Sequence, residues 1–132
     1  MPAIPDEKKL VTVLAVEDNP ANMNYLLFIL KKLNISTVAA ASGEEAIDIM
    51  KLYRFKCGLF DINLGEGMSG LHLMEIVRQE EEYKNIPIIA VTAYYGGGMH
   101  KKLLNRGFTD YLSKPYDLPQ LQELLKQYLS DL

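Results

Sequence analysis

The sequence from residue 10 to residue 20 reads LVTVLAVEDNP. Its first seven residues form an apolar, β-branched run, which predicts a buried strand. An acidic turn over residues 17–19 follows at once, and Pro20 suits the first turn of a helix. Apolar residues then recur at helical spacing from residue 23 to residue 33. The stretch therefore predicts a strand that ends at an acidic turn and leads into a helix.

The same unit recurs along the chain. Further strands are predicted over residues 35–39, 57–62, 87–92 and 108–112. Helices are predicted after the capping box of Ser42 and Glu45 up to about residue 53, around residues 71–77, over 99–106 and over 118–128. Apolar strands that alternate with helices are typical of a parallel sheet covered on both faces. We therefore expect a doubly wound α/β domain of five parallel strands over residues 10–132, after an N-terminal extension over residues 1–9. If the strands lie in the order 2-1-3-4-5, the ends of the first and third strands are adjacent.

Composition narrows the class of protein. The 132 residues are enough for one domain with a core of its own, and the net charge of −3 argues against direct nucleic-acid binding. The lone Cys57 excludes an internal disulfide. No apolar run approaches the ~20 residues that a membrane span needs, and the N-terminal segment lacks the core of a signal peptide. We expect a cytoplasmic protein with no membrane association.

Polar residues gather at the predicted carboxyl ends of the strands, where ligands bind in sheets of this kind. They are Glu17, Asp18, Asp61, Thr92 and Lys114. Two carboxylates ~4 Å apart repel by roughly 4 kcal/mol at an effective dielectric of 20, so such a cluster needs raised pKa values or a bound cation. Oxygen ligands without nearby Cys or His favour Mg²⁺ or Mn²⁺ over zinc, and Mg²⁺ commonly shares its coordination with a phosphate. Asp61 is then the best candidate nucleophile for a phosphoryl group.

Four short motifs carry a resemblance to a known family. They are Val-Glu-Asp-Asn at 16–19, Phe-Asp-Ile-Asn at 60–63, Val-Thr-Ala at 91–93 and Ser-Lys-Pro at 113–115. In this order and near this spacing, the sequence resembles the receiver domain of two-component response regulators, the CheY-like family. The resemblance covers nearly the whole chain and implies the flavodoxin-like (βα)5 fold.

The resemblance implies a phosphorylation site and a metal site. Asp61 would take the phosphoryl group from a phosphohistidine. Asp18, Asp61 and the backbone carbonyl of Asn63 would bind the cofactor Mg²⁺ directly, and Glu17 would act through water.

It also implies a switch. Lys114 would pair with a phosphoryl oxygen, and its peptide bond to Pro115 would be cis. The Thr92 hydroxyl would turn onto the phosphoryl group and Tyr111 would rotate inward. Asp61, Thr92 and Lys114 are thus the expected catalytic residues of a signalling switch that catalyses only its own phosphorylation and dephosphorylation.

The partners follow from the same resemblance. The phosphodonor would be a sensor histidine kinase or a histidine phosphotransfer protein that docks on the first helix near Asn22 and Tyr25. Output would use the fourth helix, fifth strand and fifth helix, a face that can also pair two copies into a homodimer. The sequence leaves two possibilities open for the whole protein: a stand-alone regulator, or the receiver domain of a hybrid kinase.

The chain departs from the family pattern in the loop that contains Gly65 and at the glycines 96–98. Gly65 stands where the family usually has proline. Tyr94 would shield the acylphosphate from water and slow its hydrolysis. Glycines at 96–98 begin the fourth helix, at a cost of roughly 1 kcal/mol each relative to alanine.

Two other functions compete with the receiver. A haloacid-dehalogenase-like phosphatase also joins a nucleophilic Asp, a hydroxyl, a Lys and an acidic pair around Mg²⁺. That class has its nucleophile on the first strand with an acid/base Asp two residues later, whereas here Asn63 follows Asp61. The other is a pseudo-receiver that binds partners without phosphorylation, against which the retained site residues argue. His72 and His100 receive no role.

Overall fold

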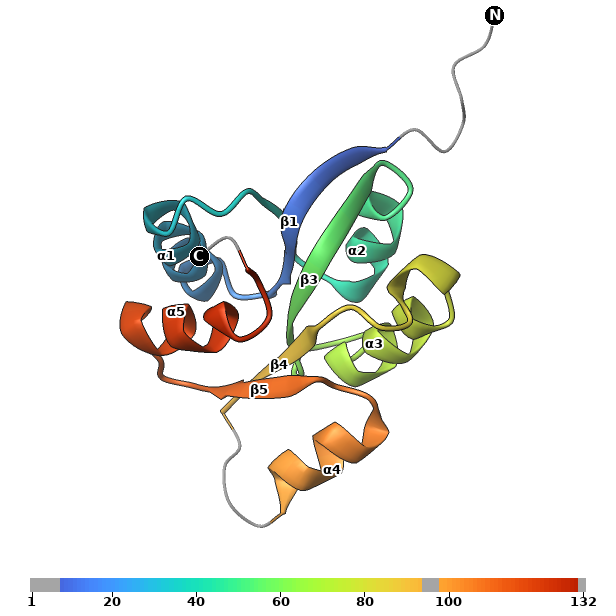
Figure 1. Ribbon diagram of the computed structural model, residues 1–132. Helices are drawn as coiled ribbons and strands as arrows, with labels where there is room; N and C mark the ends of the chain where they lie inside the picture. Colours follow the sequence, from blue (N-terminus) through green and yellow to red (C-terminus); the bar gives the residue numbers. More distant parts are fainter. Residues whose placement is uncertain (1–7, 94–97, 131–132) are drawn as a thin grey trace, which may run out of the picture.

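The computed structural model describes residues 8–93 and 98–130. Within these ranges one parallel sheet has the strand order β2-β1-β3-β4-β5, which confirms the predicted topology. Figure 1 labels β1, β3, β4 and β5 of this sheet. The strands are β1 (Lys9–Val16), β2 (Thr37–Ala40), β3 (Tyr53–Asp61), β4 (Ile88–Thr92) and β5 (Asp110–Ser113). The helices are α1 (Pro20–Lys32), α2 (Gly43–Ile49), α3 (Gly70–Arg78), α4 (Met99–Arg106) and α5 (Leu118–Lys126), with a short 3-10 helix η1 (Glu81–Tyr83).

The core consists of two layers, one on each face of the sheet. Val13 and Ala15 of β1 belong to the layer under α1 and α5, and Leu14 and Val16 belong to the layer under α2, α3 and α4. All four residues are buried, because successive side chains of a strand point to opposite faces. Burial on both faces explains why β1 is apolar without alternation.

The observed boundaries differ most from the prediction at β3 and α2, while β2 and β5 each begin two residues later and end one residue later than predicted. β3 begins at Tyr53 rather than at residue 57, because its first half alternates between inward Phe55 and the exposed Arg54 and Lys56 and so lacks an apolar run. α2 correspondingly ends at Ile49 instead of near residue 53.

The N-terminal extension ends one residue earlier than predicted, at residue 8. Lys9 is the first residue of β1 and pairs with Tyr53 of β3. Lys8 precedes the strand, and residues 1–7 lie outside the described residues, as do Tyr94, Gly96 and Gly97.

Candidate functional site

The strand order brings the predicted site residues to one rim of the sheet. Glu17 and Asp18 follow the end of β1, and Asp61 is the last residue of the neighbouring β3. Thr92 ends β4 on the other side of β3, and Lys114 follows β5. These five residues come from four strands, and they meet because parallel strands end at the same edge.

Three carboxylates form the acidic part of this rim. Glu17, Asp18 and Asp61 each offer an oxygen, and these oxygens all lie within 4.8 Å of one another. Glu17 and Asp61 are each only 5% exposed, whereas Asp18 is exposed. A cluster of carboxylate oxygens without sulfur or imidazole has the chemistry that Mg²⁺ requires. The residues present therefore fit a hard divalent cation.

Lys114 joins the two buried carboxylates. Its Nζ donates to Asp61 Oδ2 at 2.6 Å and to Glu17 Oε1 at 2.8 Å. Backbone amides hold the other carboxylate oxygens: Asn63 N donates to Asp61 Oδ1 at 2.8 Å, and Asn19 N donates to Glu17 Oε2 at 3.1 Å. The carboxylate of Asp61 is thus fixed from both sides, with the positive charge of Lys114 beside it.

Burial and charge shift the titration of this site. Burial raises the pKa of Glu17, and the neighbouring Asp61 raises it further, while Lys114 and the Asn19 amide act in the opposite direction. For Lys114, burial lowers the pKa, but the hydrogen bonds to Asp61 and Glu17 outweigh it and the net pKa is raised. Lys114 therefore stays charged at neutral pH.

The residues expected to form the switch are Thr92, which ends β4, and Tyr111 in β5. Thr92 is buried, at 2% exposure. Tyr111 is half-buried, and its ring stacks on His100 of α4 with the centroids 3.5 Å apart. His100 Nε2 lies 3.5 Å from Ser113 Oγ. Sequence reasoning gave His100 no role, because contact between a helix and a strand leaves no signal in local spacing.

Two backbone features shape the loops of the site. The Lys114–Pro115 peptide bond is cis. Gly65 has a φ of +69°, and a Cβ at this position would lie 3.0 Å from Asp18 Oδ2. Proline cannot adopt a positive φ, so the chain's departure from the family pattern matches a left-handed backbone here.

A hollow of about 600 Å³ opens over the cluster. It is lined by Glu17, Asp18, Asn19, Pro20, Asn22, Asp61, Asn63, Gly65, Thr92, Ala93 and Lys114. Every predicted metal and catalytic residue is among them. Tyr111 and Pro115 are not among its lining residues.

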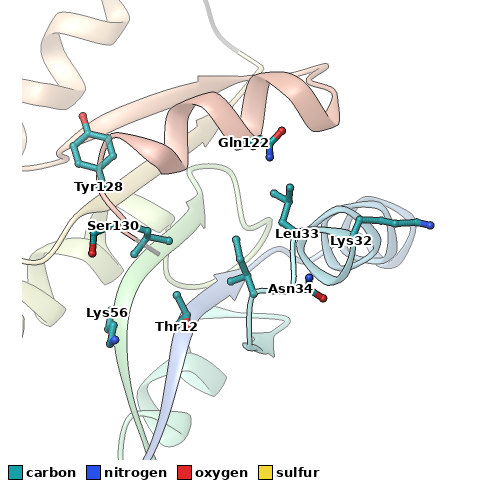
Figure 2. Close-up of a pocket in the computed structure, with 10 residues that line it drawn as sticks. Thr12, Lys32, Leu33, Asn34, Lys56, Gln122, Tyr128 and Ser130 are labelled. Carbon is teal, nitrogen blue, oxygen red and sulfur yellow. The ribbon is translucent and has the colours of Figure 1, made fainter. Parts of the chain in front are cut away.

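A second hollow, of about 540 Å³, lies away from this rim (Figure 2). Residues of β1, β3, α1 and α5 line it, among them Thr12, Lys56, Lys32 and Gln122. Among the described residues, its lining includes two lysines and no carboxylate, so these residues do not offer the ligands of a Mg²⁺ site.

The fold and the acidic rim define a receiver-type signalling domain, and comparison with known proteins identifies the family. The family model of the response regulator receiver domain matches residues 13–126. The chain is 35% identical to the polar-differentiation response regulator DivK of Brucella ovis, over 91% of this chain and 97% of that protein. It belongs to the response regulator receiver domain family of two-component systems.

Other relatives are longer proteins. The chain is 36% identical to the signal transduction histidine-protein kinase BarA of Escherichia coli K12, over 95% of this chain but only 14% of the kinase. The chain therefore spans about one seventh of the length of that relative.

Solved structures agree with this assignment. The chemotaxis response regulator CheY4 of Vibrio cholerae superimposes with a TM-score of 0.83 at 27% identity, covering 91% of this chain and 99% of that one. The receiver domain of the sensor histidine kinase PA1611 of Pseudomonas aeruginosa has a TM-score of 0.80 at 30% identity, covering 89% and 96%. The family match thus favours the receiver over the haloacid-dehalogenase-like phosphatase. None of the helices in the described part of the chain has the length and apolar character to span a bilayer.

Proposed function

We propose that Asp61 accepts a phosphoryl group from a phosphohistidine of a sensor histidine kinase or a histidine phosphotransfer protein. The observation that carries this proposal is the contact of Lys114 Nζ with both Asp61 and Glu17 at a rim that also holds Asp18 and Thr92. A carboxylate oxygen of Asp61 forms the new O–P bond while the P–N bond of the donor breaks. The electron pair of that bond stays on the imidazole nitrogen.

The chain's own residues orient and stabilise this transfer. The Asn63 amide and Lys114 hold the carboxylate of Asp61 in place before the donor arrives. The Lys114 ammonium then meets a phosphoryl oxygen, and the Thr92 hydroxyl lies on the same rim to meet another. The buried position of Asp61 limits the access of water.

The expected cofactor is Mg²⁺. Asp18, Asp61 and the backbone carbonyl of Asn63 would bind it, with Glu17 acting through water; the bound ion neutralises charge on the transferring oxygens. The close approach of three carboxylates supports this assignment. The PA1611 receiver, 30% identical to this chain, has a magnesium ion coordinated in its active site cleft.

The signal is passed on through a change in one surface of the protein. Thr92 and Tyr111 form the switch, and phosphorylation biases α4, β5 and α5, the face through which a homodimer would also form. The stack of Tyr111 on His100 supports the role of Tyr111, because any rotation of this tyrosine has to break a contact with α4. The protein acts as a cytoplasmic signalling switch and not as a metabolic enzyme.

The test is phosphorylation by a small phosphodonor. The protein is incubated with acetyl phosphate and Mg²⁺ and its intact mass is measured. We expect one phosphoryl adduct that survives acid, is lost in base and is missing in Asp61→Asn. Steady release of phosphate from an aryl phosphate, abolished by Asp61→Ala, would instead identify a phosphatase.

A further inference from the structure

A hydrogen bond ties α1 to the segment that carries Lys114. The hydroxyl of Tyr25 donates to the backbone carbonyl of Tyr116 at 2.6 Å. The two rings also touch, with their centroids 5.5 Å apart and their planes inclined by 48°. The bond joins residues 91 positions apart in the sequence. It connects the helix after the acidic turn with the connection between β5 and α5.

That connection is anchored at each end. At its start, Lys114 N donates to Thr92 O of β4 at 2.8 Å. At its end, Asp117 and Gln120 form a reciprocal capping box at the start of α5, with both bonds at 2.9 Å. The Tyr116 carbonyl lies between these anchors, two residues after Lys114.

The protein surface is hollow on the outer side of this connection. A depression of about 440 Å³ is lined by Asn22, Tyr25, Ala93, Lys114, Pro115 and Tyr116. It meets the hollow of the acidic rim, because Asn22, Ala93 and Lys114 line both. Side-chain packing therefore leaves the segment room to shift on this side, and the Tyr25 hydroxyl restrains it there.

We propose that Tyr25 is a positioning residue for phosphoryl transfer, which acts by holding the backbone next to Lys114 so that its Nζ stays on Asp61 and Glu17. This inference rests on the proposed function of Asp61. Lys114 has to meet the transferring oxygens within a few tenths of an ångström, and a misplacement of about 1 Å can cost up to about 10²-fold in rate. The tether from α1 reduces the freedom of that side chain before the phosphodonor binds.

A matched pair of variants separates positioning from plain stability. Tyr25→Phe removes the hydroxyl and keeps the ring that packs on Tyr116. Tyr128→Phe removes another tyrosine hydroxyl that also bonds at 2.6 Å, but to Asp110 Oδ2 and not at the acidic rim. Tyr128 donates to a carboxylate and Tyr25 to a neutral carbonyl, so we expect Tyr128→Phe to lower the thermal midpoint at least as much as Tyr25→Phe.

The first measurement is the rate of Asp61 phosphorylation by phosphoramidate at saturating Mg²⁺. We expect Tyr25→Phe to slow it roughly fivefold to tenfold, as for a fraction of the displacement above, and Tyr128→Phe to leave it unchanged. Equal rates for Tyr25→Phe and the unaltered protein would overturn the proposal.

A double-mutant cycle tests whether Tyr25 acts through Lys114. In a Lys114→Ala background, followed over long incubations by mass spectrometry, Tyr25→Phe is expected to have no further effect, because residues that act through one another are not additive. A further slowing of the same size in this background would contradict the proposal.

A readout in the absence of a phosphodonor keeps this inference separate from the proposed function. The ¹⁵Nζ resonance of Lys114, assigned by its loss in Lys114→Ala, is expected to move in Tyr25→Phe and not in Tyr128→Phe. If the unaltered protein never gains a phosphoryl group, the proposed function fails, and this resonance still decides the tether: movement supports it and an unchanged resonance overturns it.

Discussion

Helices α1 and α4 flank the site from opposite faces of the sheet and are held in place very differently. α1 has Pro20 in its first turn, an Asn19 side chain that accepts from Asn22 N at 2.9 Å, and four buried residues. α4 has one buried residue, Leu103, and its N-cap is Gly98 at a φ of +77° without a side-chain cap bond. α1 is thus fastened by packing and capping, and α4 by little of either.

The difference assigns the two helices different roles. α1 continues the acidic turn and carries Tyr25, so its rigidity keeps the carboxylates and Lys114 in register. α4 carries His100 against Tyr111, so its weak attachment lowers the cost of moving it when the site is phosphorylated. α1 thus forms a fixed side of the site, and α4 forms a movable side.

Truncating one buried leucine in each helix is expected to give the largest difference between α1 and α4. Leu30 in α1 is fully buried, so Leu30→Ala is expected to destabilise the whole domain by about 2–5 kcal/mol. Leu103→Ala in α4 is expected to raise amide exchange in α4 well before it affects β1. Urea denaturation with hydrogen exchange measures both. Equal loss of protection across the chain in Leu103→Ala would break the comparison.

Bound Mg²⁺ is expected to stabilise the domain as a whole without slowing the local opening of α4. At a free Mg²⁺ concentration about 100 times its dissociation constant, the free energy of unfolding is expected to rise by about 2.7 kcal/mol. Amides that exchange through local opening of α4 should not be slowed, because the ion stays bound while α4 opens. Asp18→Asn serves as the control that removes most of the stabilisation. Slower exchange in α4 on addition of Mg²⁺ alone would contradict the account.

Substitutions at the N-caps of α1 and α4 are expected to give a smaller difference between the two helices. Asn19→Ala is expected to cost about 1 kcal/mol of global stability. In the described part of the chain no atom lies within 4 Å of a Cβ added at position 98, so we expect Gly98→Ala to cost about 1–2 kcal/mol through its left-handed φ. We expect that cost to appear as faster exchange in α4. Gly98→Asn, which tolerates this conformation better, should show less of it, and an identical result for both substitutions would argue against backbone strain.

The pH dependence of the free energy of unfolding tests the buried carboxylate of Glu17, which lies on the α1 side of the site. Because burial raises the pKa of Glu17 above 4.5, the folded protein keeps this proton to a higher pH than the unfolded chain. Without divalent cations, stability should therefore fall as the pH rises from about 4.5 through the raised pKa. Glu17→Gln should remove that part of the slope in thermal melts. A slope that is the same in both proteins would contradict the assignment.

The sequence pattern was enough to predict five parallel strands and the five rim residues, and the family resemblance of the motifs supplied the sheet order. Their signals are local: an apolar run followed by Glu17 and Asp18, and single polar residues such as Asp61 at the ends of buried strands. Topology then brings them together, because neighbouring parallel strands end at one edge. The first half of β3 was missed because its alternating pattern lacks the apolar run of a strand buried on both faces.

The contacts between distant segments could not be predicted. The bond from Tyr25 to Tyr116 and the stack of His100 on Tyr111 depend on how a helix lies against a strand or loop far along the chain. No period or motif encodes such a pair in one sequence. The same holds for Arg78, whose guanidinium donates to carbonyl oxygens that include those of Gly107 and Ile86.

The central claim is that Asp61 carries the phosphoryl group, and chemical trapping tests it most directly. After incubation with acetyl phosphate and Mg²⁺, borohydride reduces an aspartyl phosphate to homoserine, and peptide mapping then identifies the altered position. The account predicts homoserine at position 61 and at no other carboxylate. Homoserine at position 18, 5-hydroxynorvaline (the alcohol that a reduced glutamyl phosphate gives) at position 17, or an unaltered residue 61 in protein that carries a phosphoryl group, would contradict it.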